Sequence, residues 1–480
     1  MRLWETYYTA TSLDDAVKLL DQYKKRARII AGGTDLIVEI EHGARAPEVV
    51  IDVTRVGGLD AIRQDPDGTV HLGPTVTHAQ AAASPLLQEH ALPLAQACWW
   101  VGAPALRNRG TIVGNLVTAS PANDTITALV ALDASVTLRS VRGDRTGKLI
   151  QFYEGVRRTR LAPDEMVVDI AIPTQTGKRQ GVYLKLGLRQ VLAIAVTNVT
   201  IVLNRDGSGS ITDARIALGS VAPTIVRASE AEAALIGASL TDATIEKVAA
   251  LALNAAHPID DVRGSAWYRR EEVSALVRRG LESLRSGEVR LGLPQPEHMV
   301  KLWGQTRRWP RLSGPTIAHH VDGDEPIQAV VNGQNVTVHG ANGKTLLRML
   351  REDLGLVGSK SGCEEGECGS CTVWLDGVAV LACMTPAPRA HGASLQTIEG
   401  LTTDGELHPV QQAFVDADAV QCGYCTPGFV MSAAKLLEEI PHPDRAQIKT
   451  ALSGNLCRCT GYYKIISAVE QAAQKQAAET

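Results

Sequence analysis

The chain has 480 residues, of which 45% are hydrophobic and 21% are charged, and its formal net charge is −4. This is the composition of a globular protein that can bury several cores, and the length predicts about three domains. The charge balance shows no basic excess for nucleic acid, and no apolar run approaches the roughly 20 residues that span a bilayer. The opening MRLWETYY lacks the parts of a signal peptide. We therefore expect a cytoplasmic protein with no membrane span and with reduced thiols.

The first predicted elements are a helix and a short strand. Ser12 is a residue type that caps helices. The apolar residues after it share one helical face: Leu13, Ala16, Val17, Leu20 and Tyr23. Ile29 and Ile30 then predict a buried strand that runs into the sequence GGTD at 32–35. A Gly-Gly turn followed by a hydroxyl can form an anion-binding nest for a phosphate, although many such turns bind nothing.

A second glycine-rich segment, RNRGTIVGNLVTASPANDT, occupies residues 107–125. Strands are predicted around it at 49–54, 69–77, 135–140 and 166–173, with a helix at 91–100. Its small polar residues suit a backbone that wraps a pyrophosphate and a ribityl chain; the alternative is a polar surface loop. The buried helix also holds Cys98, which we interpret as a small core residue.

From residue 178 the pattern predicts a small antiparallel sheet with helices on one face. A helix at 267–285 closes this part. Residues 289–325 lose periodicity and gain prolines, which indicates a linker. The basic, aromatic RRWPR at 307–311 is expected to pack on a domain surface or a partner. A hairpin at 329–340 and a helix at 345–353 follow.

Four cysteines then have the spacing C-x4-C-x2-C-x11-C: Cys363, Cys368, Cys371 and Cys383. The first three lie on a glycine-rich loop with the plant-type 2Fe-2S pattern. The turn Asp376-Gly377 predicts a hairpin of strands 372–375 and 378–381, which returns Cys383 to the loop. Three glutamates in the loop are interpreted as solvated: Glu364, Glu365 and Glu367.

The last quarter is predicted to be helical, at 408–415, 427–440, 445–452 and 464–478. It carries a second set with the spacing C-x2-C-x31-C-x1-C: Cys422, Cys425, Cys457 and Cys459. A helix starting beside Cys425 would stabilise its thiolate. Structural zinc fits this set poorly, because a C-x1-C pair is awkward for a tetrahedral ion, and disulfides would need an oxidising compartment.

The motifs GCEEGECGSC, QCGYCTPG and NLCRCTGY resemble the iron-sulfur domain of the molybdenum hydroxylases, the xanthine dehydrogenase and carbon monoxide dehydrogenase family. The segments AGGTDL, RNRGTIVGN and SPAND resemble the FAD-binding domain of that family, and YLKLGLR resembles the start of its flavoprotein C-terminal domain. The resemblance implies an α+β multidomain chain with a PCMH-type FAD-binding domain at 1–175 and the flavoprotein C-terminal domain at 178–288. After the linker at 289–325, it implies a β-grasp 2Fe-2S ferredoxin-like domain at 326–400 and an all-helical 2Fe-2S domain at 401–480.

The resemblance also implies site residues. The two cysteine sets would each hold one 2Fe-2S cluster. FAD would contact residues in both glycine-rich segments: Ala31, Gly32, Gly33, Thr34, Asp35, Leu36, Thr111, Gly114, Asn115, Ser120 and Asp124. Lys185 would approach the flavin edge; the alternative is a solvated strand lysine. Val113 stands where the family usually has glycine, which bears on how closely the backbone approaches FAD.

No constellation of acid, base or nucleophile stands out, so we assign no catalytic residue. The resemblance implies an electron-transfer subunit that takes electrons from a molybdopterin-binding large subunit. They would pass through the second cysteine set and then the first to FAD, and on to NAD, oxygen or quinone. We expect a dimer of heterodimers. The substrate classes that fit are purines and other N-heterocycles, aldehydes and carbon monoxide. Two alternatives are a stand-alone flavin and iron-sulfur reductase and a redox sensor.

Overall fold

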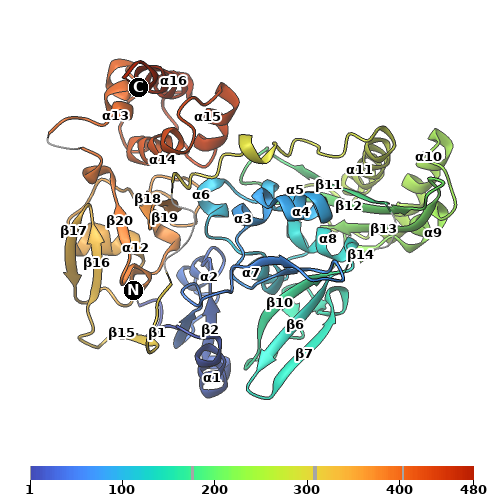
Figure 1. The fold of residues 1–480 in the computed structure, drawn as a ribbon, viewed down its shortest axis with the longest axis horizontal. Coiled ribbons are helices and arrows are strands. Elements are labelled where there is room, and N and C mark those ends of the chain that lie inside the picture. Colours follow the sequence, from blue (N-terminus) through green and yellow to red (C-terminus); the bar gives the residue numbers. More distant parts are fainter. Residues whose placement is uncertain (1, 174–177, 306–310, 403–404, 480) are drawn as a thin grey trace. The chain divides into compact units, whose positions relative to one another are not determined.

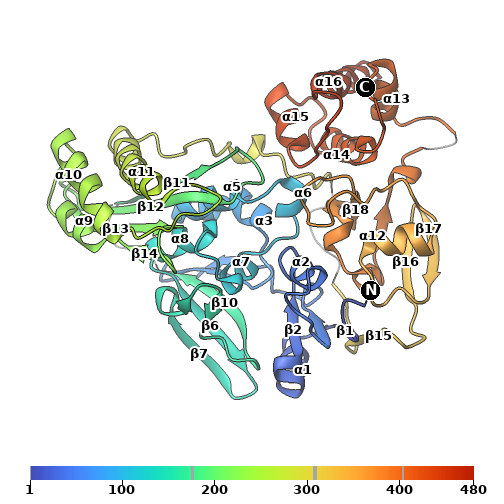
Figure 2. The same ribbon diagram turned by 180° about the vertical axis from the view of Figure 1, so that it is seen from behind.

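The computed structural model describes residues 2–173, 178–305, 311–402 and 405–479. The chain forms two compact units, each built from segments that are distant in sequence. Unit 1 comprises Met1–Gly57, Gly102–Gly110 and His298–Thr480, and unit 2 comprises Gly58–Val101 and Thr111–Glu297. Figures 1 and 2 show the path of the chain from opposite sides.

The N-terminal sheet of unit 1 has the strand order β15-β1-β3-β2. Its strands are β1 (Thr6–Thr9), β2 (Ala27–Ile30), β3 (Val49–Asp52) and β15 (Ile317–His320). Strands β1, β2 and β3 run parallel, and β15 pairs antiparallel with β1. The segment predicted as a linker therefore supplies a strand. Most of RRWPR lies outside the described residues.

Two helices connect the parallel strands. Helix α1 (Leu13–Tyr23) begins where predicted, because the Ser12 side chain accepts a hydrogen bond from the Asp15 amide at 3.1 Å. Helix α2 (Leu36–Glu41) follows the Gly32-Gly33 turn, in which Gly33 has φ +79°.

The second sheet of unit 1 has the order β17-β16-β20-β18-β19. Its strands are β16 (Ile327–Val331), β17 (Gln334–Val338), β18 (Thr372–Leu375), β19 (Val378–Leu381) and β20 (Ser394–Gln396). The predicted turn between β18 and β19 is confirmed, with φ +52° at Asp376 and +81° at Gly377, as a type I′ turn requires. Helix α12 (Leu346–Arg348) and a π-helical turn (Met349–Asp353) pack on this sheet. One hydrophobic cluster includes Tyr7 and Ile37 together with Val373 and Leu395, so the two sheets share a core.

The helical part of unit 1 confirms the four predicted helices, and each helix end lies within one residue of its predicted position. They are α13 (Pro409–Asp416), α14 (Thr426–Glu439), α15 (Arg445–Leu452) and α16 (Tyr463–Glu479). Their apolar faces form one core that includes Phe414, Phe429 and Leu436. Unit 1 also contains the short helix α6 (Pro104–Arg107).

Unit 2 begins with a sheet of order β4-β5-β10-β6-β7. Its strands are β4 (Ile62–Gln64), β5 (Val70–Leu72), β6 (Ser135–Ser140), β7 (Gly143–Lys148) and β10 (Met166–Ile172). A small ribbon joins β8 (Tyr153–Gly155) to β9 (Arg158–Thr159). The helices of this part are α3 (His78–Ala83), α4 (Pro85–His90), α5 (Leu92–Trp100), α7 (Ile112–Thr118) and α8 (Asp124–Ala131).

The second sheet of unit 2 is antiparallel, in the order β11-β12-β13-β14. Its strands are β11 (Lys178–Gly187), β12 (Ala195–Arg205), β13 (Ile211–Gly219) and β14 (Val226–Arg227). Helices α9 (Ser229–Leu235), α10 (Asp242–Ala252) and α11 (Ala266–Ser286) pack on one face (Figure 1). The predicted helices on one face are confirmed, and α8 in addition lies against the other face, where the Thr127 hydroxyl donates to Asn198 at 2.7 Å. Residues 195–204 of β12 are all buried as a result.

Within the described ranges, no helix combines the length and the apolar character needed to cross a membrane.

Two histidines in unit 1 link strand β15 to the second sheet. A nitrogen of His319 lies 3.3 Å from one of His391, and His319 is 1% exposed. Burial, followed by the proximity of His391, lowers the pKa of His319 to about 4, and burial also lowers the pKa of His391. Glu325 opposes the shift at His319, whereas His320 adds to it. Both side chains are therefore neutral at pH 7.

We expect the chain to lose thermal stability as the pH falls from about 6.5 towards 4, because the unfolded histidines bind protons that the folded pair excludes. The full contribution to the free energy of unfolding is present above the pKa that histidine has in the unfolded chain. His319 can account for up to about 3 kcal/mol of this free energy. His319→Gln should flatten the dependence of the melting temperature on pH, measured by calorimetry. His90→Gln, at a partly exposed histidine, is the control. Equal slopes for His319→Gln and the wild type would contradict this account.

Candidate functional site

The first cysteine loop is built around hydrogen bonds to sulfur. The Sγ of Cys363 accepts backbone N–H groups from Glu365, Glu367 and Cys368, each at 3.4 Å. Gly366 and Gly369, with φ +79° and +69°, allow the tight path this requires. Such bonds favour a thiolate and orient the sulfur towards a metal, but the hydrogen bond to Cys368 and burial outweigh them and raise the pKa of Cys363.

The four cysteines of this first set form two pairs. The Sγ atoms of Cys371 and Cys383 lie 3.4 Å apart and both residues are buried. Cys363 pairs with Cys368, and a hydrogen bond from Cys363 lowers the pKa of Cys368 to about 6. The hydrogen bond from Cys383 likewise lowers the pKa of Cys371. In each pair, one thiol is therefore deprotonated more readily than its partner.

The second cysteine set lies at the start of α14 and in the loop before α16. Sγ of Cys422 and of Cys459 are 3.6 Å apart, and both residues are exposed. Burial acts to raise the pKa of Cys457, but the hydroxyl and amide of Thr460, at 3.1 and 3.4 Å, lower it overall. Burial raises the pKa of Cys425 to about 12, although α14 begins beside this residue as predicted and a backbone hydrogen bond acts in the opposite direction.

The paired arrangement fits a 2Fe-2S cluster, in which each iron takes two protein ligands. The all-cysteine donor sets and their pairing are thus consistent with one cluster at each set.

The two cysteine loops contact each other directly. The amide of Leu456 donates to the carbonyl of Cys368 at 2.9 Å. The Asn455 side chain donates to the carbonyl of Gly369 at 3.1 Å. A Cβ on Gly369 would lie 2.3 Å from the carbonyl oxygen of Gly454, so only glycine fits there. The segment that carries Cys457 is thus held against the backbone that carries Cys368.

The first predicted flavin segment, residues 31–36, lies in unit 1. A Cβ on Gly32 would lie 2.3 Å from the carbonyl oxygen of Arg109, and one on Gly33 would lie 2.8 Å from that of Met384. The Arg109 side chain also donates to the carbonyl of Ala31 at 3.0 Å. Packing within unit 1 therefore requires both glycines, whether or not they face a phosphate. The exposed Asp35 and half-buried Thr34 and Leu36 follow them.

The second predicted flavin segment is divided at Gly110, and its predicted flavin residues, from Thr111 to Asp124, belong to unit 2. Thr111 caps α7, and its hydroxyl accepts from the amide of Gly114, an exposed glycine, at 3.0 Å. An exposed helix start without a Cβ suits an anionic group such as pyrophosphate. Asn115 accepts hydrogen bonds from Asn123 and Thr125, so it also holds the loop in place.

Asp124 and Lys185, both predicted flavin residues, meet in a buried ion pair. Nζ of Lys185 lies 3.0 Å from Oδ2 of Asp124 and 3.3 Å from the carbonyl oxygen of Trp100. The lysine side chain is 4% exposed, so the alternative of a solvated lysine is wrong. Tyr183, which the sequence analysis missed, donates its hydroxyl to Asp124. The two-residue spacing that puts Tyr183 and Lys185 on one face of β11 was the available signal.

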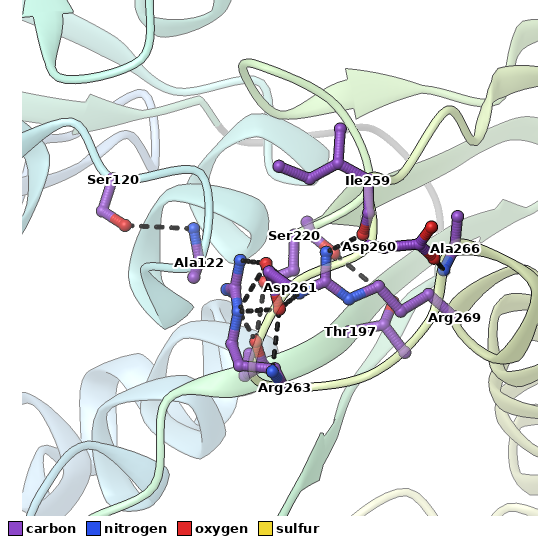
Figure 3. A network of polar contacts seen from close by, with 12 residues as sticks. Ser120, Ala122, Thr197, Ser220, Ile259, Asp260, Asp261, Arg263, Ala266 and Arg269 are labelled. Atoms are coloured by element: carbon purple, nitrogen blue, oxygen red, sulfur yellow. Dashed lines mark hydrogen bonds and ion pairs between the residues drawn. The ribbon is translucent and has the colours of Figure 1, made fainter.

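A network on the same sheet braces the loop before α8 (Figure 3). Asp261 accepts from Arg263 and Arg269, each at 2.7 Å, and the bonds from Arg263 hold the pKa of Asp261 well below its usual range. Arg263 and Ser220 both donate to the carbonyl of Ala195, at 3.2 and 2.9 Å. The amide of Ser220 donates to the carbonyl of Pro121 at 2.7 Å. The loop of Ser120 is therefore fixed by the sheet, beside the Ser120–Ala122 hydrogen bond in Figure 3.

Comparisons with known proteins match four successive parts of the chain. Residues 3–175 match the FAD binding domain in molybdopterin dehydrogenase, and residues 183–284 match the CO dehydrogenase flavoprotein C-terminal domain. Residues 329–390 match the 2Fe-2S iron-sulfur cluster binding domain, and residues 397–470 match a 2Fe-2S binding domain. The matched domains bind one FAD-type and two 2Fe-2S cofactors.

Individual relatives match either the flavin part or the iron-sulfur part. The nicotinate dehydrogenase FAD-subunit of Eubacterium barkeri is 35% identical over 277 residues, which are 57% of this chain and 93% of that protein. The nicotine 6-hydroxylase small subunit of Paenarthrobacter nicotinovorans is 50% identical over 143 residues, 30% of this chain and 86% of that protein. A carbon monoxide dehydrogenase structure from Hydrogenophaga pseudoflava has 32% identity and a TM-score of 0.56, covering 59% of this chain and 97% of that chain.

We expect Lys185→Met to destabilise the chain, because it leaves the buried Asp124 carboxylate without its cation. Breaking a buried pair in this way costs about 3–5 kcal/mol. Lys148→Met, which removes a half-exposed pair with Asp133, should cost about 0–1 kcal/mol. Melting temperatures of the two variants test the difference. Equal losses would contradict a structural role for the Lys185–Asp124 pair.

Proposed function

Because the chain belongs to the molybdenum hydroxylase family, as a fusion of its FAD-binding and iron-sulfur parts, we propose that it serves a complex that hydroxylates an aromatic N-heterocycle. The role of this chain is electron transfer, and a separate molybdopterin-binding partner would act on the substrate. The nicotinate dehydrogenase and nicotine 6-hydroxylase relatives support this substrate class. A carbon monoxide dehydrogenase-type complex is the second candidate, supported by the structural match over 59% of the chain.

The hydrogen bond from Leu456 to Cys368 is the observation that carries the proposed electron-transfer role. Bound clusters would move electrons one at a time, and FAD would release them in pairs. We assign the ligands of one cluster to Cys363, Cys368, Cys371 and Cys383, and those of the other to Cys422, Cys425, Cys457 and Cys459. The bond places the backbone of one ligand, Cys368, one residue away from another, Cys457.

The difference in exposure between the two cysteine sets supports an order of electron transfer. Cys422 and Cys459 are exposed, whereas Cys371 and Cys383 are buried. Exposed apolar and aromatic side chains occur close in sequence to the second set: Tyr424, Leu456 and Tyr463, at 47%, 44% and 77% exposure. We propose that this face receives the molybdopterin-binding partner and that electrons enter there.

The contact made by the residue after the first cysteine set supports the same order of electron transfer. Cys383 is followed by Met384, whose carbonyl oxygen lies against Gly33 in the first predicted flavin segment. We propose that the residues predicted in both segments and Lys185 contribute to FAD binding. Electrons would then leave to NAD, oxygen or quinone.

The proposed organisation follows the family, with domains at 1–175, 178–288, 326–400 and 401–480 and a connecting segment at 289–325. We place the chain in the cytoplasm, because cluster ligands must be reduced thiols. A dimer of heterodimers is the assembly we propose.

Cofactor analysis of the purified chain should give about four iron atoms, four sulfides and one FAD, since each 2Fe-2S cluster holds two irons and two sulfides. Iron and sulfide assays and the flavin spectrum measure this. Cys371→Ser should halve the iron content, whereas Cys98→Ala, at the buried ninth cysteine, should leave it unchanged. Two irons in the wild type, or zinc in their place, would refute one of the assignments.

We expect Cys422→Ser to interrupt electron entry while the flavin remains bound. In the assembled complex, substrate should then reduce the flavin at least tenfold more slowly, because about 1.4 kcal/mol on the barrier already gives that factor. A direct reductant of the flavin should still act at the wild-type rate. Stopped-flow absorbance follows both reactions. Flavin reduction by substrate at the unmodified rate would remove the second cysteine set from the path.

A further inference from the structure

Helix α2 extends from the first predicted flavin segment to the loop of the first cysteine set. At its start, the amide of Ile37 donates to the carbonyl of Gly33 at 3.0 Å. At its end, Glu41 and His42 both contact residues of unit 1 that lie more than 300 positions later in the sequence. All of these residues belong to unit 1.

Arg348 joins the end of α2 to the cysteine loop. Its Nη2 lies 3.0 Å from Oε1 of Glu41 and 2.9 Å from Oε2 of Glu364. The arginine and Glu41 side chains are 22% and 13% exposed, so solvent screens this bridge only partly. The other oxygen of Glu364 accepts a hydrogen bond from Ser361.

A second contact joins the same two segments. Nε2 of His42, the residue after α2, lies 2.9 Å from Oε1 of Glu365. Two of the three loop glutamates are therefore engaged by side chains from outside the loop. The interpretation as solvated is wrong for the half-buried Glu364, whereas Glu365 and Glu367 are exposed. Glu364 directly follows Cys363 in the chain.

We propose that Arg348 is a positioning residue that sets the reduction potential of the cluster at the first cysteine set. This rests on the ligand assignment in the proposed function. An added electron is repelled by nearby carboxylates and attracted by a nearby guanidinium. Arg348 offsets the charge of Glu364 and Glu41 beside this loop, and so it makes reduction easier.

The same bridge keeps the loop against α2. Glu364 has φ +54°, a backbone conformation that is uncommon for residues other than glycine and that needs support from its surroundings. Arg348 and Ser361 supply that support through the carboxylate. The bridge therefore combines two effects, the local charge and the position of the loop relative to the helix that begins at the first flavin segment.

The test is a redox titration of the full chain, loaded with FAD and clusters and followed by electron paramagnetic resonance. The signal of interest is the one that Cys371→Ser removes. Arg348→Gln should shift its midpoint to more negative potential, and Glu364→Gln should shift it to more positive potential. Arg348→Lys, which keeps the charge, should stay closer to the wild type than Arg348→Gln. Arg445→Gln, at an exposed pair with Glu470, is the matched control and should not move it.

Opposite shifts distinguish a charge effect from simple loosening, because loss of order alone would move both variants in the same direction or in neither. Unchanged midpoints in Arg348→Gln and Glu364→Gln, or shifts of the same sign, would overturn the inference. If Arg348→Gln fails to assemble, Glu364→Gln and Arg348→Lys still decide it. A wild-type chain that lacks two clusters would instead refute the proposed function, so the two failures are distinguishable.

Discussion

The hydrogen bond between the amide of Leu456 and the carbonyl of Cys368 is the contact on which the arrangement of both cysteine loops depends. Around it, glycine is needed on both sides: a Cβ on Gly428 would lie 2.2 Å from the carbonyl oxygen of Gly369. Neither loop can therefore move away without breaking backbone contacts that no side chain could replace. A transfer of electrons between separate cofactors requires this kind of fixed, close approach.

Buried charges add a second constraint in unit 1. Arg389 lies 3.3 Å from Asp376 in the β18–β19 turn, and Arg55, which follows β3, lies 3.9 Å from the same carboxylate. Burial, with Arg389 nearby, lowers the pKa of Arg55 to about 10, which still leaves it charged at neutral pH. A buried charge that loses its partner is costly. These ion pairs therefore hold the two sheets of this unit in a fixed position relative to each other. The cysteine hairpin and the N-terminal sheet consequently behave as parts of one structure.

Local patterns in the sequence were sufficient for much of the fold. The Ser12 cap and the Asp376-Gly377 turn each depend on neighbouring residues, and both are confirmed. The cysteine spacings are also local patterns in the sequence. The ligand assignment itself stays a prediction, although the thiol pairs fit it. Contacts between distant segments could not be read in this way. The pairing of β15 with β1 and the bridge from Arg348 to Glu41 each join residues more than 300 positions apart. Likewise, nothing in YLKL indicates that Lys185 would be buried against Asp124.

The pairing of β1 with β15 bears on how this chain is made. Thr9 pairs with Ile317, so the first strand of the sheet leaves the ribosome long before its antiparallel neighbour exists. At about 5–20 residues per second, the delay is roughly 15–60 s. During that time the intervening residues of unit 2 can complete a core of their own, whereas the cluster that contains Tyr7 and Ile37 stays incomplete until Val373 and Leu395 arrive. Fusing the two kinds of subunit into one polypeptide has thus left one edge of β1 without its partner strand for most of synthesis, and an unpaired strand edge can pair with other chains unless it is protected.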